Sequence, residues 1–134
     1  MERLQKAVGK AVEQFRKPAV NRFAPFNTDK GKALLYFNRI ILVRTAVQDS
    51  RDKEVLLQDG QVMLLKNISF DALSEVLPPN GFCRVNKKEI LALSAIRFFS
   101  HDEITLQATD KNGKPITVGL SEKYRPDFLE KVNG

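Results

Sequence analysis

Residues 81–96 read Gly-Phe-Cys-Arg-Val-Asn-Lys-Lys-Glu-Ile-Leu-Ala-Leu-Ser-Ala-Ile and form the most informative stretch of this 134-residue chain. Five apolar side chains are spaced so that they can anchor its backbone against a core: Phe82, Val85, Ile90, Leu93 and Ile96. Four polar or basic side chains project together from the turn between the anchors: Arg84, Asn86, Lys87 and Lys88. Cations in a fixed turn can meet phosphates, and an amide can meet base edges. A solvated basic turn with no binding role has the same composition, so this stretch alone leaves both interpretations open.

Segments upstream of this stretch predict a buried sheet. Residues 33–37 and 40–46 are apolar and rich in β-branched or aromatic side chains, a composition typical of buried strands. Residues 55–57 and 62–65 are two further β-prone runs, and the pair Asp59-Gly60 between them tolerates positive φ. These two runs therefore predict a β-hairpin.

A second hairpin is the clearest local pattern in the chain. Residues 104–108 alternate between apolar and polar side chains, Asn112-Gly113 is a turn pair, and residues 116–120 form the returning strand. Pro115 at the start of that strand predicts a sheet edge or a strand end, because proline has no N–H for a neighbouring strand. Between the two hairpins, residues 89–96 carry apolar side chains at positions that fit either a helix or a strand.

Short helices are predicted at the margins of this β-rich domain. Ser69 is a suitable N-cap for a helix over residues 70–77, which carries its apolar side chains on one face. The segment 121–132 predicts a terminal helix, in which Pro126 is tolerated only near the first turn. The expected fold class is therefore mostly β, with antiparallel hairpins and short flanking helices.

The first part of the chain differs in character from the rest. Residues 2–16 place apolar side chains at three- and four-residue steps and predict an amphipathic helix, whose apolar face must pack on something. Pro18 predicts the end of that helix. Residues 17–32 are rich in Pro, Asn, Lys and Gly and predict a linker. We divide the chain into an N-terminal helix and linker over residues 1–20 and a single domain over residues 21–134.

Composition and charge indicate one globular domain with a polyanionic partner. With 43% hydrophobic and 28% charged side chains, 134 residues suffice for one core. Lys and Arg number 22 against 16 Asp and Glu, and the resulting formal charge of +6 suits nucleic acid. Much of this excess lies in the N-terminal segment, where it can serve solubility alone. No apolar run approaches the ~20 residues of a membrane span and no signal-peptide pattern is present, so we expect a cytoplasmic protein without membrane attachment.

Candidate catalytic and metal-binding residues are few. Cys83 is the only cysteine, which excludes a disulfide framework and a multi-cysteine zinc site. His101 is the only histidine and lies beside Asp102 and Glu103 in a polar turn, a pattern typical of a solvated loop. No group of metal ligands has a suitable spacing, and a nucleophilic Cys83 would need a histidine partner. The sequence therefore predicts no enzymatic activity and no cofactor.

Residues 82–96 resemble the central signature of the LytTR DNA-binding domain family. In that family a Phe-x-Arg-Val-His/Asn turn with polar or basic residues leads into a hydrophobic segment that ends in Ile, as it does in this chain. The neighbouring elements follow in a similar order, from residues 38–43 to the closing Leu120-Ser121-Glu122-Lys123-Tyr124. The resemblance extends over residues 21–132 and implies an elongated, mostly antiparallel β-fold of LytTR type with short flanking helices.

The same resemblance implies a domain context and partners. Residues 2–15 are similar to the final helix of a response-regulator receiver domain, which implies that this chain is the C-terminal portion of a bacterial two-component regulator. A receiver domain and a sensor kinase would then act upstream of it. The implied function is sequence-specific binding of double-stranded DNA in successive major grooves, by a homodimer on repeated half-sites, to regulate transcription.

Three segments correspond to the DNA-contacting positions of the family. The resemblance implies phosphate contacts by four basic side chains: Arg51, Lys53, Lys88 and Lys123. It implies that Asn86 and Lys87 read base edges. Arg84 and Ser121 complete the candidate DNA-binding residues, and Asp52 and Glu122 occupy the same segments.

Three departures from the family pattern keep other functions open, one of which is the mixed charge of the loop over residues 51–54. Glu122 stands where the family usually has a base-contacting arginine, and Ala92 replaces a frequent asparagine. A carboxylate repels phosphates, although it can accept from a cytosine amino group, and Lys123 or Arg125 would then take the positive role. One alternative is a protein-interaction module of the same fold with weak or lost DNA binding. Another is a small β-barrel that binds RNA or single strands, which would need exposed aromatic side chains on a sheet face.

Overall fold

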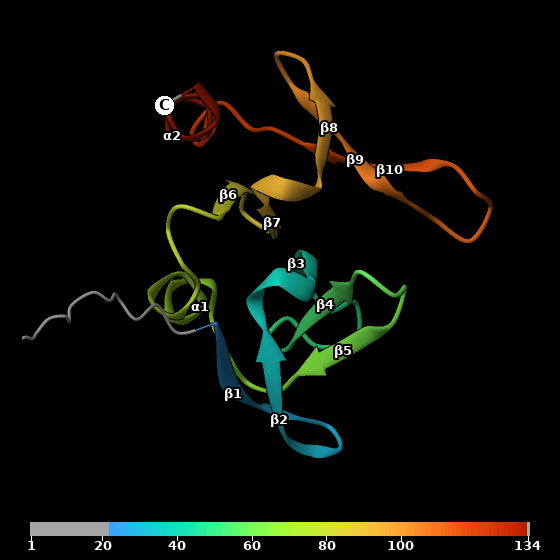
Figure 1. The fold of residues 1–134 in the computed structure, drawn as a ribbon. Coiled ribbons are helices and arrows are strands. Elements are labelled where there is room, and N and C mark those ends of the chain that lie inside the picture. The colour runs from blue at the N-terminus through green and yellow to red at the C-terminus, as the bar shows by residue number, and fades with distance from the viewer. Residues whose placement is uncertain (1–21, 134) are drawn as a thin grey trace, which may run out of the picture.

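The computed structural model describes residues 22–133, which form ten strands, two α-helices and two short 3-10 helices (Figure 1). Their order along the chain is β1 (Phe23–Thr28), β2 (Gly31–Tyr36), η2 (Phe37–Arg39), β3 (Ile40–Thr45), β4 (Lys53–Leu57), β5 (Val62–Leu65), α1 (Phe70–Val76), β6 (Phe82–Asn86), β7 (Glu89–Ala92), η3 (Leu93–Ala95), β8 (Ile96–Phe99), β9 (Glu103–Thr109), β10 (Pro115–Gly119) and α2 (Arg125–Asn133). The chain is therefore mostly β with short helices, as predicted.

These strands form two antiparallel sheets. The larger sheet has the order β2-β1-β5-β4-β3-β7-β6, and the smaller has the order β10-β9-β8. β1 pairs with β5 at Thr28 and Leu65 only, among the residues described, so the β1–β2 hairpin diverges from the rest of its sheet. In Figure 1 this hairpin lies at the bottom of the molecule, and the small sheet and α2 lie at the top. The predicted elongated antiparallel fold is confirmed.

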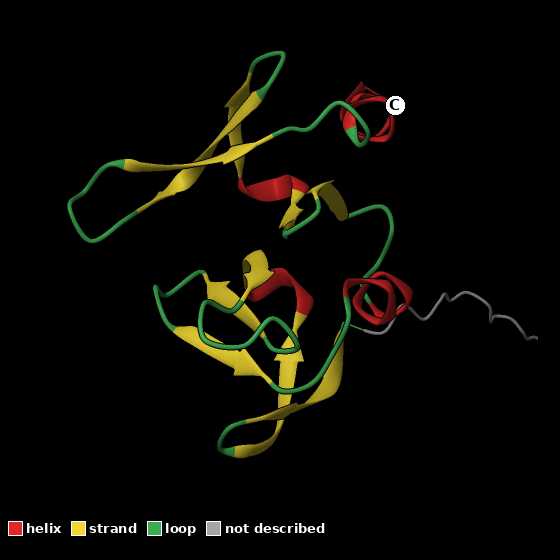
Figure 2. Ribbon diagram, turned by 180° about the vertical axis from the view of Figure 1, so that it is seen from behind, coloured by secondary structure: helices red, strands yellow, loops and turns green. Residues whose placement is uncertain are grey.

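The two helices lie on one side of the molecule. Both views place α1 and α2 at the same lateral margin, with β6 and β7 between them in height (Figures 1 and 2). The long β9–β10 hairpin extends toward the opposite margin. The turn between β6 and β7 therefore lies in the part of the fold that carries both helices.

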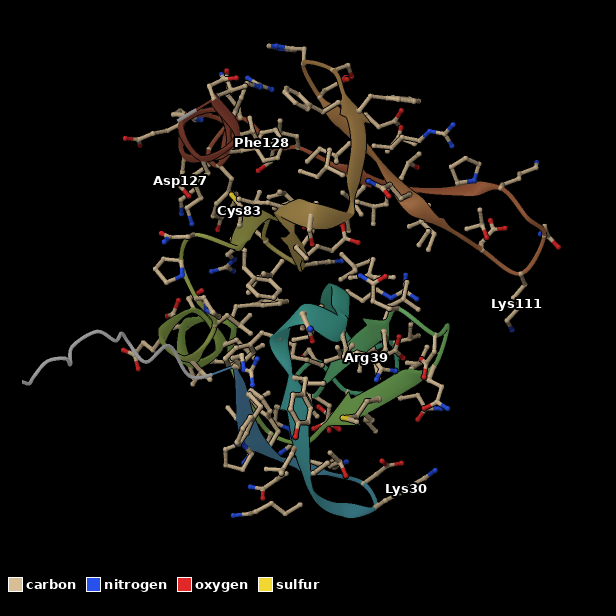
Figure 3. All side chains as sticks on the ribbon, in the orientation of Figure 1. Lys30, Arg39, Cys83, Lys111, Asp127 and Phe128 are labelled. Carbon is tan, nitrogen blue, oxygen red and sulfur yellow. The ribbon has the colours of Figure 1, made fainter. Side chains whose placement is uncertain are left out.

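One hydrophobic core runs through both sheets. Val85 and Leu91 of the large sheet and Ile104 and Leu106 of the small sheet are fully buried. Phe128 of α2 closes this core (Figure 3), and its ring packs edge-on against an aromatic ring of β8 at a centroid distance of 5.1 Å. Burial of these apolar side chains is the main force that holds the sheets and helices together.

Both hairpins predicted from their turn pairs are present. β4 and β5 flank Gly60, which has a φ of 89°, and β9 and β10 flank Gly113, which has a φ of 80°. Glycine adopts positive φ readily because it has no Cβ. Pro115 begins β10, which is an edge strand of the small sheet, as its missing N–H predicted.

The predicted linker over residues 17–32 is wrong for its second half. Residues 23–28 form β1, which pairs along its whole length with β2. Pro25 is tolerated because the hydrogen-bond pattern of this hairpin requires no N–H at its position. Phe26 is buried on the core side and stabilises the strand. The helix predicted over residues 2–16 and the boundary at residue 20 lie outside the described residues.

The short elements around the central stretch follow the prediction closely. α1 ends one residue before the predicted end, and the Ser69 side chain accepts a hydrogen bond from Ala72 N at 3.1 Å, as an N-cap does. Residues 89–96, which fitted a helix or a strand, form β7, the single turn η3 and the first residue of β8. Ile90 and Leu91 pair with β3, so the first part of this segment is a strand.

α2 begins later than predicted. The carbonyl of Ser121 accepts hydrogen bonds from Tyr124 N and Arg125 N, both at 3.1 Å, so residues 121–124 form a turn and the helix starts at Arg125. Pro126 is the second residue of the helix, where proline is tolerated, as predicted. None of the helices within residues 22–133 is long and apolar enough to cross a membrane.

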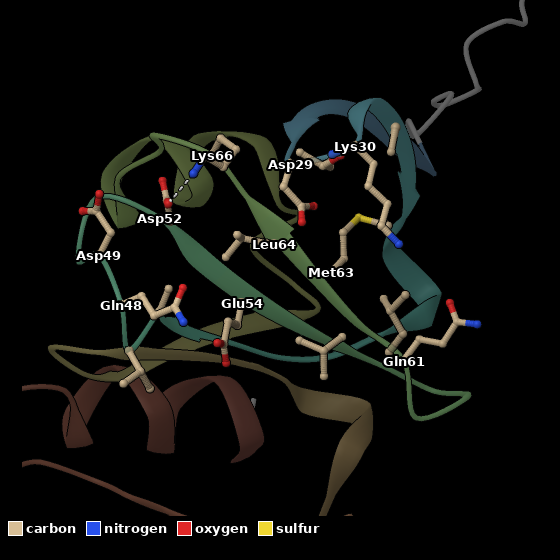
Figure 4. Close-up of a pocket in the computed structure, with 16 residues that line it drawn as sticks. Asp29, Lys30, Gln48, Asp49, Asp52, Glu54, Gln61, Met63, Leu64 and Lys66 are labelled. Atoms are coloured by element: carbon tan, nitrogen blue, oxygen red, sulfur yellow. Dashed lines mark hydrogen bonds and ion pairs between the residues drawn. The ribbon is translucent and has the colours of Figure 1, made fainter.

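A buried carboxylate fastens the loop before β4 to the end of β5. Asp52 is 6% exposed; its Oδ2 accepts from Lys66 Nζ at 2.9 Å, and its Oδ1 accepts from Asn67 N at 2.8 Å (Figure 4). The hydrogen bond from Lys66, followed by that from Asn67, lowers the pKa of Asp52 below its ordinary value. Asn67 has a φ of 51°, which few non-glycine residues adopt, so Asp52 also holds an uncommon backbone conformation.

Asp52→Asn is expected to destabilise the fold at neutral pH and to have less effect in acid. Because the folded-state pKa of Asp52 lies below its unfolded value, its stabilisation is present above about pH 4 and is lost as pH falls through the folded-state pKa. Urea unfolding at pH 7 and pH 3 measures the difference in midpoint from wild type. Asp102→Asn, at an exposed side chain in the turn before β9, is the control and should change little. If the urea midpoints of Asp52→Asn and wild type differed equally at both pH values, a stabilising role for the charged form of Asp52 would be contradicted.

Candidate nucleic-acid interface

Lys87 and Lys88 form the tip of a two-residue turn between β6 and β7. Asn86 pairs with Glu89 as the last pair of the ladder, so the two lysines alone make the connection. Both lysines are exposed, while the apolar anchors next to the turn are buried. The structure therefore shows the predicted arrangement, in which buried strands hold a turn from which the lysines project.

The side chain of Asn86 holds this turn in place. Its Oδ1 accepts from Lys88 N at 2.8 Å, and its Nδ2 donates to Glu89 Oε1 at 2.9 Å and to Gly119 O at 2.7 Å. Both amide hydrogens are thus used within the protein, whereas one lone pair of Oδ1 is left. Because Gly119 ends β10, the same side chain joins the turn to the small sheet.

Arg84 lies between two aromatic rings and supports the turn. Its guanidinium carbon is 4.9 Å from the ring centroid of Phe70 and 5.3 Å from that of Tyr124. Its Nη2 donates to Lys87 O at 3.1 Å, and its Nε donates to Asn86 O at 3.4 Å. The side chain is 28% exposed. Arg84 therefore connects α1, the turn and the segment before α2.

The two predicted basic contacts at the start of β4, Arg51 just before the strand and Lys53 as its first residue, are both engaged within the protein. Arg51 is 77% exposed, and its Nε and Nη2 donate to the two carboxylate oxygens of Asp49 at 3.1 and 2.8 Å. These bonds hold the pKa of Asp49 at about 2. Lys53 is 4% exposed, its Nζ donates to Ser50 O at 2.8 Å and lies 5.0 Å from the Phe70 ring centroid, and burial lowers its pKa. A phosphate contact by either residue therefore competes with its present partner.

The segment before α2 lies on the other side of the turn. Ser121 N donates to Val85 O at 2.9 Å, which fastens this segment to β6. Glu122 and Lys123 are exposed, and Lys123 Nζ is 5.6 Å from the Tyr124 ring centroid. The Glu122 carboxylate is thus exposed beside a lysine of the candidate interface.

Two shallow hollows meet at the turn. One, of about 410 Å³, lies between the turn and the segment before β4 and is lined in part by Lys53 and Arg84. The other, of about 470 Å³, lies between the turn and the segment before α2 and is lined in part by Lys123. Lys87 and Lys88 line both hollows. We call these five side chains the basic surface; they come from all three segments that the LytTR resemblance implied as DNA contacts.

Another hollow, away from the turn, has a different character. It has a volume of about 750 Å³ and lies over β4 and β5 (Figure 4). Carboxylates outnumber lysines in its lining, which includes Asp29, Asp49, Asp52, Glu54, Lys30 and Lys66. This balance does not suit a polyanion.

The lone cysteine and the lone histidine line neither of the two hollows at the turn. Cys83 is buried in β6, its Sγ is 3.7 Å from Asp127 Oδ2 (Figure 3), and burial raises its pKa to about 11. The thiol is therefore protonated at neutral pH and is a poor nucleophile. His101 is exposed. Within residues 22–133, no group of three or more His, Cys, Asp or Glu is placed to hold a metal ion.

Comparison with known proteins identifies the fold. No family model and no curated protein matches the sequence. Among solved structures, the chain is similar to the LytTr DNA-binding domain of a putative methyl-accepting/DNA response regulator from Bacillus cereus, with a TM-score of 0.63 and 17% sequence identity. The match covers 86% of this chain and 100% of that chain. This chain has the LytTR fold. The predicted resemblance is thereby confirmed at the level of the fold.

Sequence reasoning missed the aromatic pair that holds Arg84. Phe70 was expected only as an apolar residue of its helix, and Tyr124 only as part of a closing motif. The rings reach the guanidinium from elements far apart in the chain, so no local pattern marks the contact. The arginine in the family signature was the available signal, because Arg commonly stacks on aromatic faces.

Arg84→Ala is expected to lower the free energy of unfolding by about 1–3 kcal/mol, because it removes two ring contacts and two hydrogen bonds. In a double-mutant cycle with Tyr124→Ala, we expect a coupling of about 0.5–1 kcal/mol, measured by chemical denaturation. Arg39→Ala is the control: its guanidinium pairs with Asp59 on the exposed surface and should cost less than about 0.5 kcal/mol. A coupling near zero between Arg84 and Tyr124 would show that the stack contributes nothing.

Proposed function

We propose that this chain binds double-stranded DNA through the basic surface, as the output domain of a response-regulator transcription factor. The observation that carries the proposal is the position of Lys87 and Lys88 where two hollows meet, between the other two segments that the LytTR resemblance implied as DNA contacts. A projecting turn of this kind can contact phosphates and enter a groove at once. The LytTR fold, which the chain shares with the B. cereus DNA-binding domain, supports the proposal. Binding of this kind involves no catalysis and no cofactor.

The residues nearest the turn take roles that fit their surroundings. Lys88 and Lys123 are exposed and are assigned to phosphates, and Lys87 is assigned to a base edge. Asn86 keeps its predicted role through the remaining lone pair of Oδ1, which can accept from an adenine or cytosine amino group. Arg84 acts from within the protein by holding the turn.

Three further residues are proposed as secondary phosphate contacts. Ser121 lines the hollow next to α2 and can donate through its hydroxyl. Arg51 can reach a phosphate after exchanging Asp49 for it, and Lys53 after leaving the carbonyl of Ser50. We further propose that the chain binds as a homodimer on repeated half-sites in the bacterial cytoplasm. A receiver domain and a sensor kinase would act upstream of it.

The placement of aromatic rings favours duplex over single strands. A single-strand site needs exposed rings beside cations as stacking platforms. Phe23 and Tyr36 are exposed, but they lie in the β1–β2 hairpin, at the opposite end of the large sheet from β6. Phe98 is exposed on β8 and lines neither hollow of the basic surface. Tyr124 lines one hollow, but its ring is already in contact with Arg84 and Lys123.

Duplexes selected from a random library, with binding measured by fluorescence anisotropy, test this function. We expect the full chain to prefer the selected duplex to its single strands, with log K falling against log salt by roughly 0.9 per neutralised phosphate. Lys88→Ala should weaken binding to every duplex and reduce that slope by about 0.9. Lys87→Ala should cost about 1–3 kcal/mol on the selected site and less on a single-base variant.

Lys111→Ala is the matched control for these variants. Lys111 lies at the tip of the β9–β10 hairpin, away from the margin that carries the helices (Figure 3), so its loss removes the same charge at a distance. Its affinity should stay close to that of wild type. Equal losses from Lys88→Ala and Lys111→Ala would contradict the assigned surface. A folded chain that binds no duplex even at low salt would overturn the function and favour the protein-interaction module.

Asp49→Asn is expected to raise DNA affinity and to steepen its salt dependence. The substitution frees Arg51 from its bidentate partner, so up to one further phosphate contact forms and the slope grows by up to about 0.9. Asp59→Asn is the control, because it frees Arg39 from a comparable pair with a distance of 3.1 Å. The same salt titration measures the DNA affinity and its salt dependence for both variants. An equal gain from the two variants would show that net charge, and not Arg51, is responsible.

A further inference from the structure

β2 is an open sheet edge beside an exposed apolar face. It ends the large sheet, and within residues 22–133 no strand pairs with its outer side. Phe23 is opposite Tyr36, and Pro25 is opposite Leu34, across the β1–β2 hairpin. All four side chains are exposed on the same face; Leu34 is 56% exposed, and the rings of Phe23 and Tyr36 are 5.1 Å apart. Open edges and apolar patches are features that proteins usually cover or pair.

The hydrogen-bond pattern shows which backbone groups of this edge are free. Phe37 N donates to Arg22 O in the same register as the β1–β2 hairpin, so this pair is a hydrogen-bonded one. Hydrogen-bonded and non-bonded pairs alternate along an antiparallel ladder. It follows that every second residue of β2 directs its N–H and C=O away from β1 toward the open edge: Lys32, Leu34 and Tyr36.

We propose that β2 pairs with β2 of a second copy of this chain, antiparallel about a two-fold axis at Leu34. In this register Leu34 lies opposite Leu34 of the second copy, and Lys32 lies opposite its Tyr36. All three residues with free backbone groups then become members of hydrogen-bonded pairs on both strands. A shift by two residues would leave one of the three on each strand without a partner.

The side chains of this edge are complementary to themselves, which favours a second copy over an unrelated partner. Lys32 lies opposite an aromatic ring and not opposite another lysine, so the pairing brings no like charges together and allows a cation–π contact. The two Leu34 side chains meet at the axis and bury each other's exposed surface. An isologous contact of this kind closes after two copies, so it consumes the edge and starts no further growth.

This interface is separate from the basic surface. β2 and β6 are the two end strands of the large sheet, and β6 carries the lysine turn. The dimer therefore leaves the basic surfaces of both copies accessible, and the inference does not depend on DNA binding.

Analytical ultracentrifugation of the full chain over a range of concentrations tests the interface. We expect a concentration-dependent dimer in the wild type and a dissociation constant at least about tenfold higher for Leu34→Lys, which places two lysines opposite each other. Val62→Lys is the matched control, because Val62 is a strand residue that is 55% exposed, against 56% for Leu34. It should leave the dimer unchanged, and circular dichroism shows whether each variant is folded.

Oxidative cross-linking gives an independent answer if Leu34→Lys fails to fold. Leu34→Cys should form a disulfide-linked dimer, whereas Val62→Cys should not, and wild type reports the background from buried Cys83. A monomeric wild type at high concentration would overturn the inference, and would be the result if residues 1–21 of the same chain cover this face. A dimer that survives Leu34→Lys, or equal cross-linking at both positions, would place the interface elsewhere. Retained duplex binding by Leu34→Lys would show that the proposed function stands apart from this result.

Discussion

The candidate interface depends on the hydrogen bonds that hold the Lys87-Lys88 turn. Asn86 joins the turn to the end of β10 through Gly119, and on the other side Thr45 N donates to Lys88 O at 3.0 Å. Long lysine side chains have high conformational entropy, so a mobile turn would spread their charges over many positions. Because the backbone here is tied to both neighbours, three separate segments of the chain present their polar side chains as one surface.

The cations of this region differ in how available they are, although each has the same formal charge. Lys87, Lys88 and Lys123 are exposed, while Lys53 is buried and Arg51 is neutralised by Asp49. A cation that already has a partner gains less from a phosphate, because it must first give up the existing bonds. The basic surface is therefore strongest at the turn and weaker toward the segment before β4.

The two end strands of the large sheet have different surroundings. At β6, the Phe70 ring of α1 and the Tyr124 ring before α2 hold Arg84, which supports the exposed lysine turn. At β2 the sheet ends in an open strand beside exposed apolar residues. An open antiparallel sheet always has two edges, and here one edge strand leads into a basic turn while the other lies beside an exposed apolar face.

Local patterns in the sequence determined the hairpins at Asp59-Gly60 and Asn112-Gly113, the Ser69 cap and the lysine turn, because turn preferences and periodicity act over a few residues. β1 was missed, since its composition is that of a linker and only pairing with β2 makes it a strand. Tertiary structure alone decided that Arg84 lies between two aromatic rings and that Lys53 is buried. Residue type determines the charge a side chain can carry, but burial and partners arise only when distant segments of the chain meet.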